Sequence, residues 1–160
     1  MIFRPAAVGD SPAIMQHKRG EGYAGLVGRW PQEADEAEFG KADSAFLLAD
    51  DGAGPLRFVM LPRLDKAFGN VLLRRIAVAE PSQGVGSALL RYAAAYVFAQ
   101  PAANRLYLHP HSRNRWAIEA YARFGFKEEG IEPLSYRRAD GQREGNVLMS
   151  LPGPEWEAFA

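Results

Sequence analysis

The 160-residue sequence contains no cysteine. This absence excludes disulfide bonds, thiolate metal ligands and any catalytic intermediate carried on a cysteine. The chain also lacks net charge, because 19 basic residues balance 19 acidic ones. A neutral chain gives no electrostatic reason to expect nucleic acid or an anionic membrane as a partner.

Long hydrophobic runs are missing as well. The longest run, residues 93–99, falls far short of the roughly 20 residues that span a bilayer, and the first residues lack the pattern of a signal peptide. We therefore expect no membrane association and a cytoplasmic location. With 48% hydrophobic and 24% charged residues and no internal repeat, the composition is typical of one globular domain over residues 1–160.

The apolar spacing predicts alternating strands and helices. Helices are expected from residue 11, capped by Asp10, and then over 85–100 and 114–124, where apolar residues recur at three and four positions. Residues 20–40 are expected to form a loop that leads into a short helix. Strands are expected at 2–5, 44–48, 56–61, 71–78, 105–108, 126–131 and 146–151. This order predicts a mixed α+β sheet with helices on both faces.

The turn after residues 71–78 is the most informative stretch. It runs Glu-Pro-Ser-Gln-Gly-Val-Gly over residues 80–86 and leads at once into the helix that begins at Val85. Unpaired amides and the helix dipole favour a phosphate there, and Gly84 and Gly86 carry no side chain that would keep it away. A plain strand-to-helix turn, in which glycine supplies only backbone freedom, fits the same residues.

Two other nucleotide motifs fit this turn poorly. A P-loop needs a lysine after its second glycine, where the chain has Ser87 and Ala88. A dinucleotide fingerprint needs a small residue where Leu89 stands and an acidic residue about 20 positions later, and residues 105–108 contain no acid. A nucleotide-binding oxidoreductase is therefore disfavoured.

A second cluster follows in the helix expected over 114–124. Asn114 stands at its start, Tyr121 lies two turns later on its apolar side, and Gly125 terminates it. Taken singly, Tyr121 also fits a core aromatic residue and Asn114 also fits a helix cap.

The two clusters together, in this order and spacing, resemble the GNAT superfamily of N-acetyltransferases, over roughly residues 71–151. The resemblance implies a mostly antiparallel central sheet of about six to seven strands, with acetyl-CoA as co-substrate and no metal. It also implies main-chain amides of residues 83–87 on the coenzyme A pyrophosphate, a strand at 76–78 along the pantetheine arm, and Tyr121 as proton donor to the leaving sulfur. The cofactor-binding residues carried over in this way are Ile76, Val78, Gln83, Gly84, Val85, Gly86, Ser87, Asn114 and Tyr121.

The general base stays open. The strand before the loop often carries an acidic residue or a histidine in the family, whereas this chain has Arg74 and Arg75. Other candidates for the base are Glu21, Glu80, His109 and His111. The two histidines also fit a metal pair, although no third ligand is clustered with them in the sequence.

The acceptor is expected to be a small-molecule or peptide amine. Neutralising a lysine-like amine, with a pKa of about 10.4, costs about 4 kcal/mol near pH 7.4, whereas an α-amine needs under about 1 kcal/mol. This favours an amino-acid-like or N-terminal amine, and Arg74 is expected to bind an anionic group on it. Arg74 also fits a pairing with a nearby acid or with the cofactor.

Three further residues are candidates for the acceptor pocket, and packing under a loop explains them equally well: Glu21, Tyr23 and Trp30. The alternative function is a non-catalytic module that binds coenzyme A as a sensor or scaffold. Assembly as a homodimer is compatible with the sequence.

Overall fold

The computed structural model describes residues 1–17, 37–62, 64, 68–74, 84–138 and 140–160. The elements in chain order are β1 (Ile2–Pro5), η1 (Val8–Asp10), α1 (Ser11–His17), β2 (Ala45–Asp50), β3 (Pro55–Leu61), β4 (Asn70–Leu72), α3 (Val85–Phe98), β5 (Arg105–Leu108), α4 (Arg115–Phe124), β6 (Lys127–Arg137), β7 (Arg143–Pro152) and α5 (Gly153–Phe159). None of the helices described is long and apolar enough to cross a membrane.

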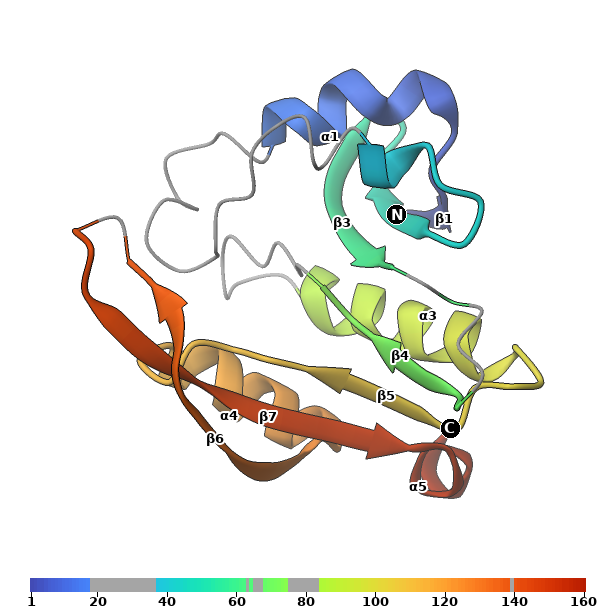
Figure 1. Cartoon of the computed structure of the whole chain (residues 1–160). Helices are drawn as coiled ribbons and strands as arrows, with labels where there is room; N and C mark the ends of the chain where they lie inside the picture. The colour runs from blue at the N-terminus through green and yellow to red at the C-terminus, as the bar shows by residue number, and fades with distance from the viewer. Residues whose placement is uncertain (18–36, 63, 65–67, 75–83, 139) are drawn as a thin grey trace.

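The strands form two groups, with orders β1-β2-β3 and β4-β5-β7-β6 (Figure 1). The pair β4–β5 is parallel, and the other strand pairs are antiparallel. An antiparallel bridge between Met60 and Arg74 joins the two groups, with N–O distances of 2.8 and 3.0 Å. The expected α+β fold with a mixed, mostly antiparallel arrangement of strands is confirmed.

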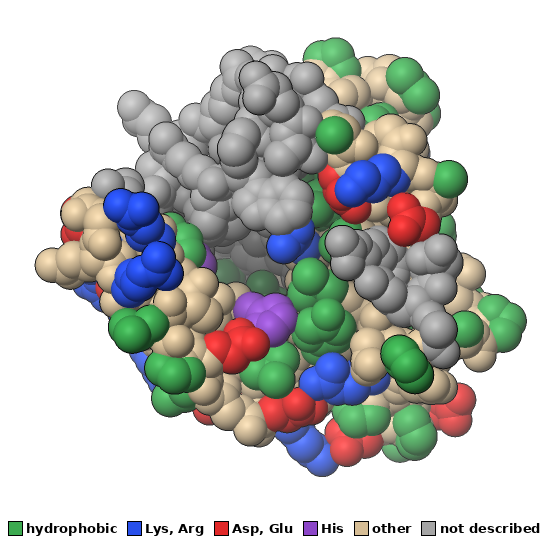
Figure 2. All heavy atoms as spheres, in the orientation of Figure 1, with side chains coloured by type: hydrophobic (Ala, Val, Ile, Leu, Met, Phe, Trp, Pro, Cys, Tyr) green, Lys and Arg blue, Asp and Glu red, His purple; other side chains and the backbone are tan. Residues whose placement is uncertain are grey.

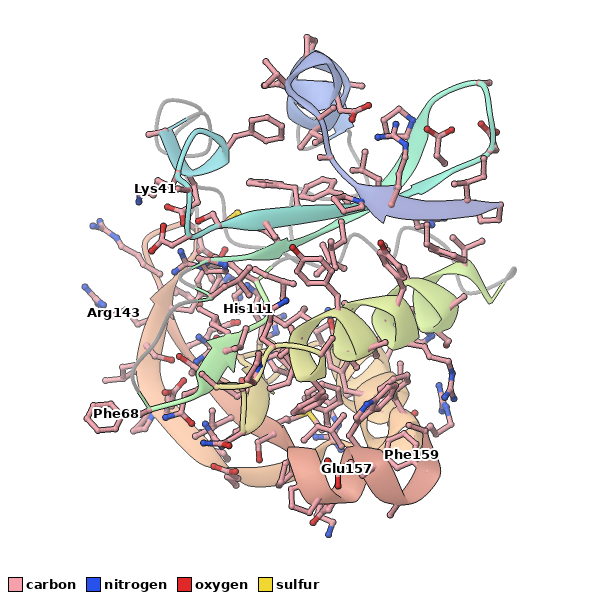
Figure 3. The ribbon with its side chains drawn as sticks, turned by 90° about the vertical axis from the view of Figure 1, so that its right-hand side faces the viewer. Lys41, Phe68, His111, Arg143, Glu157 and Phe159 are labelled. Atoms are coloured by element: carbon pink, nitrogen blue, oxygen red, sulfur yellow. The ribbon has the colours of Figure 1, made fainter. Side chains whose placement is uncertain are left out.

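Helices cover both faces of the first group of strands. Figure 3 shows α1 on one side of β1–β3 and α3 on the other. The smaller core lies under α1, where Ile14 packs on side chains from β2 and β3. The larger core lies on the α3 side and continues beneath α4 and α5. Burial of these apolar side chains supplies the main driving force for the fold.

Helix α3 shows the predicted spacing of apolar residues at three and four positions. The buried residues of α3 are Leu89, Leu90, Ala93, Ala94 and Val97. The buried residues of α4 are Ala117 and Ile118. Figure 1 shows α3 and α4 behind the four-stranded group, and no helix in the described part of the chain covers the side toward the viewer. This open side and the ends of β4 and β5 are the setting of the site.

Several predicted boundaries differ from the structure. The strand expected at 71–78 is described as β4 over Asn70–Leu72 and a bridge at Arg74, and its predicted end at 75–78 lies outside the described residues. The hairpin of β6 and β7 is longer than predicted at both strands. Most of β6 is exposed on both sides, so its sequence has no apolar alternation to mark it.

Two further elements differ from expectation. Asp10 does not cap α1: its carboxylate accepts the N–H of Ala7 and pairs with Arg4, so it stabilises the turn η1 and its link to β1. The C-terminal helix α5 was not predicted. Pro154 and Glu155 in its first turn are a helix-start signal that could have revealed it.

Gly69 fixes how β4 meets β5. Its carbonyl accepts the N–H groups of Asn104 and Arg105, at 2.8 and 3.1 Å, and its φ is +68°. A side chain there is impossible without movement, because a Cβ would lie 2.1 Å from the carbonyl oxygen of Ala102. Gly69 therefore sets the parallel register in which Asn70 pairs with Arg105.

Candidate active site

The N-terminus of α3 presents unpaired amides. Gly84 adopts a left-handed conformation, with φ of 66°, and no side chain caps the helix. The first helical bond runs from the N–H of Ala88 to the carbonyl of Gly84. The amides of Val85, Gly86 and Ser87 thus have no acceptor in the described part of the chain, and the helix dipole favours an anion beside them. Of the predicted pyrophosphate loop, Gln83 lies outside the described residues.

The start of α4 is fixed by Asn114. Its side-chain oxygen accepts the N–H of Ala117 at 3.2 Å, which is a helix cap. At the other end, the N–H of Gly125 bonds the carbonyls of Tyr121 and Ala122, and Gly125 has a φ of +125°. The capping role of Asn114 is thus observed, and its contact with a cofactor stays a prediction.

Tyr121 points from α4 toward the larger core. Its ring meets the ring of Phe126 edge-on, with centroids 6.0 Å apart. Although the residue as a whole keeps some exposure, protein atoms surround its hydroxyl, and this burial raises the pKa of Tyr121 well above its ordinary value. No hydrogen bond to that hydroxyl comes from the residues that the structure describes. A phenol in this state is protonated at neutral pH and is free to donate.

The described pairing of β4 with β5 ends at Leu72 and Tyr107. The N–H of Leu73 bonds the carbonyl of Tyr107 at 2.8 Å, and Arg74, whose backbone groups point to the opposite edge of the strand, bonds Met60 of β3. The strand residues expected beyond this point, Ile76 and Val78, lie outside the described residues.

The alternation of side chains places Arg74 and His109 on the same side of the sheet. Val71, Leu73, Leu106 and Leu108 belong to the larger core, on the side of α3 and α4. The residues between and after them, which include Arg74 and His109, therefore face the open side. If the β4–β5 register continued beyond Leu72–Tyr107, Arg74 would stand opposite His109.

Arg74 also lies near a buried carboxylate. Glu38 is only 4% exposed, and burial alone would raise its pKa. Hydrogen bonds from Lys41 and Ser44, with the charges of Lys41 and Arg74, instead hold the pKa of Glu38 below its ordinary value. The charge of Arg74 thus acts on Glu38, and the pairing of Arg74 with an acid, with the cofactor or with the acceptor stays a prediction.

The two histidines after β5 have different partners. His109 Nδ1 lies 2.6 Å from Glu132 Oε2, whereas His111 Nδ1 lies 2.8 Å from the side-chain oxygen of Asn146. The ring of His111 also stacks on Tyr136, with centroids 3.8 Å apart. The described residues contain no group of three side chains able to hold a metal ion. In Figure 2 a histidine side chain (purple) lies beside acidic side chains (red) below a hollow in the surface.

Sequence reasoning did not find Glu132. It is 23 positions from His109 and reaches it only through the pairing of β6 with β7 and β7 with β5. The remaining predicted site residues lie outside the described residues: Glu21, Tyr23, Trp30, Arg75 and Glu80.

Solved structures with the same fold are acetyltransferases. A spermidine N-acetyltransferase from Vibrio cholerae, in complex with CoA and spermine, has a TM-score of 0.80 at 17% identity, covering 98% of this chain and 97% of its own. The ribosomal-protein-S18-alanine N-acetyltransferase from Escherichia coli has a TM-score of 0.78 at 22% identity, covering 94% and 92%. At these identities, the likeness establishes the fold.

The family follows from the sequence itself. The model of the acetyltransferase (GNAT) family matches residues 13–126, which is more than half of the chain. The matched segment includes β4, the start of α3, β5 and all of α4. The protein therefore belongs to the acetyltransferase (GNAT) family.

Proposed function

We propose that the protein transfers the acetyl group of acetyl-CoA to a primary amine by direct attack in a ternary complex. The observation that carries this proposal is the uncapped start of α3 at residues 84–87, which lies inside the segment matched by the family model. Three free amides and a helix dipole suit the pyrophosphate of coenzyme A. The chain has no cysteine on which an acyl-enzyme could form.

Tyr121 is the proposed proton donor to the leaving thiolate. Its buried hydroxyl and its raised pKa keep the proton in place until a strong base appears beside it. A thiolate expelled from the thioester is such a base. Asn114 orients α4, and thereby Tyr121, through the cap at its first turn.

The proposed acceptor is an amino-acid-like or peptide N-terminal amine. Two arguments support this acceptor. An α-amine has a lower pKa than a lysine-like amine and is therefore easier to neutralise. The cation of Arg74 lies on the open side of the sheet, where a carboxylate or phosphate of the acceptor could pair with Arg74. Glu38 competes for the same cation. Two of the structural neighbours are named for spermidine and for a ribosomal-protein alanine, and both amine classes belong in the screen.

The test is a two-part measurement. Calorimetry should detect acetyl-CoA binding and no binding of NAD, and thiol release should then rank amino acids, peptides and polyamines as acceptors. Acetyl-CoA binding without turnover on any amine would favour the non-catalytic sensor. For the preferred acceptor, Arg74→Ala should raise the acceptor KM about tenfold or more and leave the acetyl-CoA KM unchanged. Preference for polyamines, or a response of the acetyl-CoA KM alone, would overturn the role of Arg74.

A further inference from the structure

β6 is irregular where it passes the end of β5. Between the pairs Glu132–Asn146 and Tyr136–Glu144, residues 133–135 of β6 stand opposite residue 145 alone. Leu134 in this bulge has a φ of 56°, in the left-handed region that residues other than glycine rarely adopt. Bulges re-aim neighbouring side chains and often lie next to active sites.

The bulge is held by Ser135. Its hydroxyl donates to the carbonyl of Glu132 at 2.8 Å and accepts the N–H of Asn146 at 3.1 Å. These bonds fix the backbone at Glu132, whose carboxylate reaches across β7 to His109. The position of the Glu132 carboxylate is thus set by strand β6 and not by a loop.

The contact with Glu132 gives the imidazole of His109 one proton-accepting atom. A carboxylate at Nδ1 places the ring proton on Nδ1 when the imidazole is neutral, which leaves the lone pair on Nε2. No group in the described part of the chain bonds Nε2. The side chain is 28% exposed, so a substrate can approach it.

His109 and Tyr121 lie on opposite sides of the sheet. His109 lies on the open side, just past the last described pair of β4 and β5, Leu72 and Tyr107. Tyr121 lies on the other side, with the larger core. The proton acceptor and the proposed proton donor are therefore separate groups that one variant each can remove.

From this geometry we infer that His109, oriented by Glu132, is the general base of acetyl transfer; the inference rests on the proposed function. Nε2 takes a proton from the acceptor ammonium, and the neutral amine attacks the thioester carbonyl. A C–N bond forms, the C–S bond breaks, and the thiolate receives the proton of Tyr121. The acceptor nitrogen loses two protons in the whole reaction. One of them restores the hydroxyl of Tyr121, and the other is released to solvent. Glu132 is a positioning residue.

The test compares pH profiles of kcat/KM for the parent, His109→Gln and Glu132→Gln, with the acceptor that the amine screen selects. The parent should lose kcat/KM toward acid pH, an acid limb, because a protonated imidazole cannot accept the proton of the ammonium; the described groups that contact the ring are Glu132 and Tyr107. His109→Gln should lose that limb and about 100-fold in activity at pH 7. Its deficit should shrink toward pH 10, because the acceptor then loses its proton to the solvent. Glu132→Gln should lose about tenfold in kcat/KM at pH 7.

The neighbouring imidazole supplies the control. His111→Gln removes a histidine that contacts the side-chain amide of Asn146 and the ring of Tyr136. The pH profile of kcat/KM for this variant should keep the acid limb of the parent. Calorimetry on each variant should give the same acetyl-CoA affinity as the parent. A variant that keeps this affinity is folded, so its loss of activity is a loss of catalysis.

The outcomes separate the two proposals. If the parent acetylates amines and both His109→Gln and Glu132→Gln keep its pH profile, the inference is overturned and the proposed function stands. If His109→Gln does not fold, an unchanged rate in Glu132→Gln overturns the inference by itself. If the parent binds no acetyl-CoA, the proposed function fails and the inference falls with it.

Discussion

Replacement of Gly69 by alanine should damage the junction of β4 and β5 by two separable effects. The first is the backbone conformation, since φ is +68° and the left-handed region costs an L-residue about 1–2 kcal/mol. The second is overlap: the new Cβ would lie 2.1 Å from the carbonyl oxygen of Ala102 and 2.9 Å from the amide nitrogen of Asn104. Overpacking against backbone typically costs about 1–3 kcal/mol. The expected total loss in free energy of unfolding is therefore about 2–5 kcal/mol.

Gly84→Ala is the matched control, because Gly84 has nearly the same φ of +66° and nothing within 4 Å of its Cβ position. It should cost about 1–2 kcal/mol, the backbone effect alone. Urea denaturation measures the loss of stability in both variants, and thermal melting should show Gly69→Ala about 4–20 °C below the parent. Equal destabilisation of the two variants would refute the overlap argument and, with it, the role of Gly69 in setting the register.

Three further predictions concern the cofactor site, the acid and the N-terminal ion pair. Gly86→Asp should weaken acetyl-CoA binding about 100-fold by calorimetry, because a carboxylate then faces the pyrophosphate; an unchanged Kd in a folded variant would rule out the site. Tyr121→Phe should lower kcat about 10- to 1000-fold with the acetyl-CoA Kd unchanged, and steady turnover would reduce Tyr121 to a core aromatic. Arg4 lowers the pKa of Asp10 to about 2 from 3.8, so the pair stabilises the fold above pH 4 and this contribution is lost as the pH falls through 2. Asp10→Asn should therefore cost about 1 kcal/mol at pH 7, after allowance for the partial exposure of Arg4, and almost nothing near pH 1; a cost independent of pH would contradict the ion-pair explanation.

Helices α3 and α4 and the turn before α3 could be predicted from the sequence because their signals are local. The spacing of Leu89 and Ala93 is visible within one helix, and Gly84 stands directly before the helix start that its left-handed conformation permits. The β2–β3 hairpin was also predictable, since its turn residues lie between two apolar runs. Each of these elements is determined by residues within a few positions of one another.

The contact of Glu132 with His109 could not be predicted because it depends on strand order and on a bulge. Nothing near Glu132 marks it as a partner of His109, and β6 lacks the alternation that would reveal its register. The same holds for Arg74: its sequence position suggests a side of the sheet, but only the fold shows Glu38 nearby.

The last helix has a consequence for how this chain can be handled. Trp156 stacks near Phe98 of α3 and Phe124 of α4, at 6.0 and 6.4 Å, and Phe159 lies edge-on to Phe124. α5 therefore holds together the C-terminal ends of α3 and α4, the helices that carry the proposed phosphate amides and Tyr121. A C-terminal truncation that removes Trp156 should loosen the packing that aligns these two helices. An affinity tag is accordingly better placed before Met1 than after Ala160.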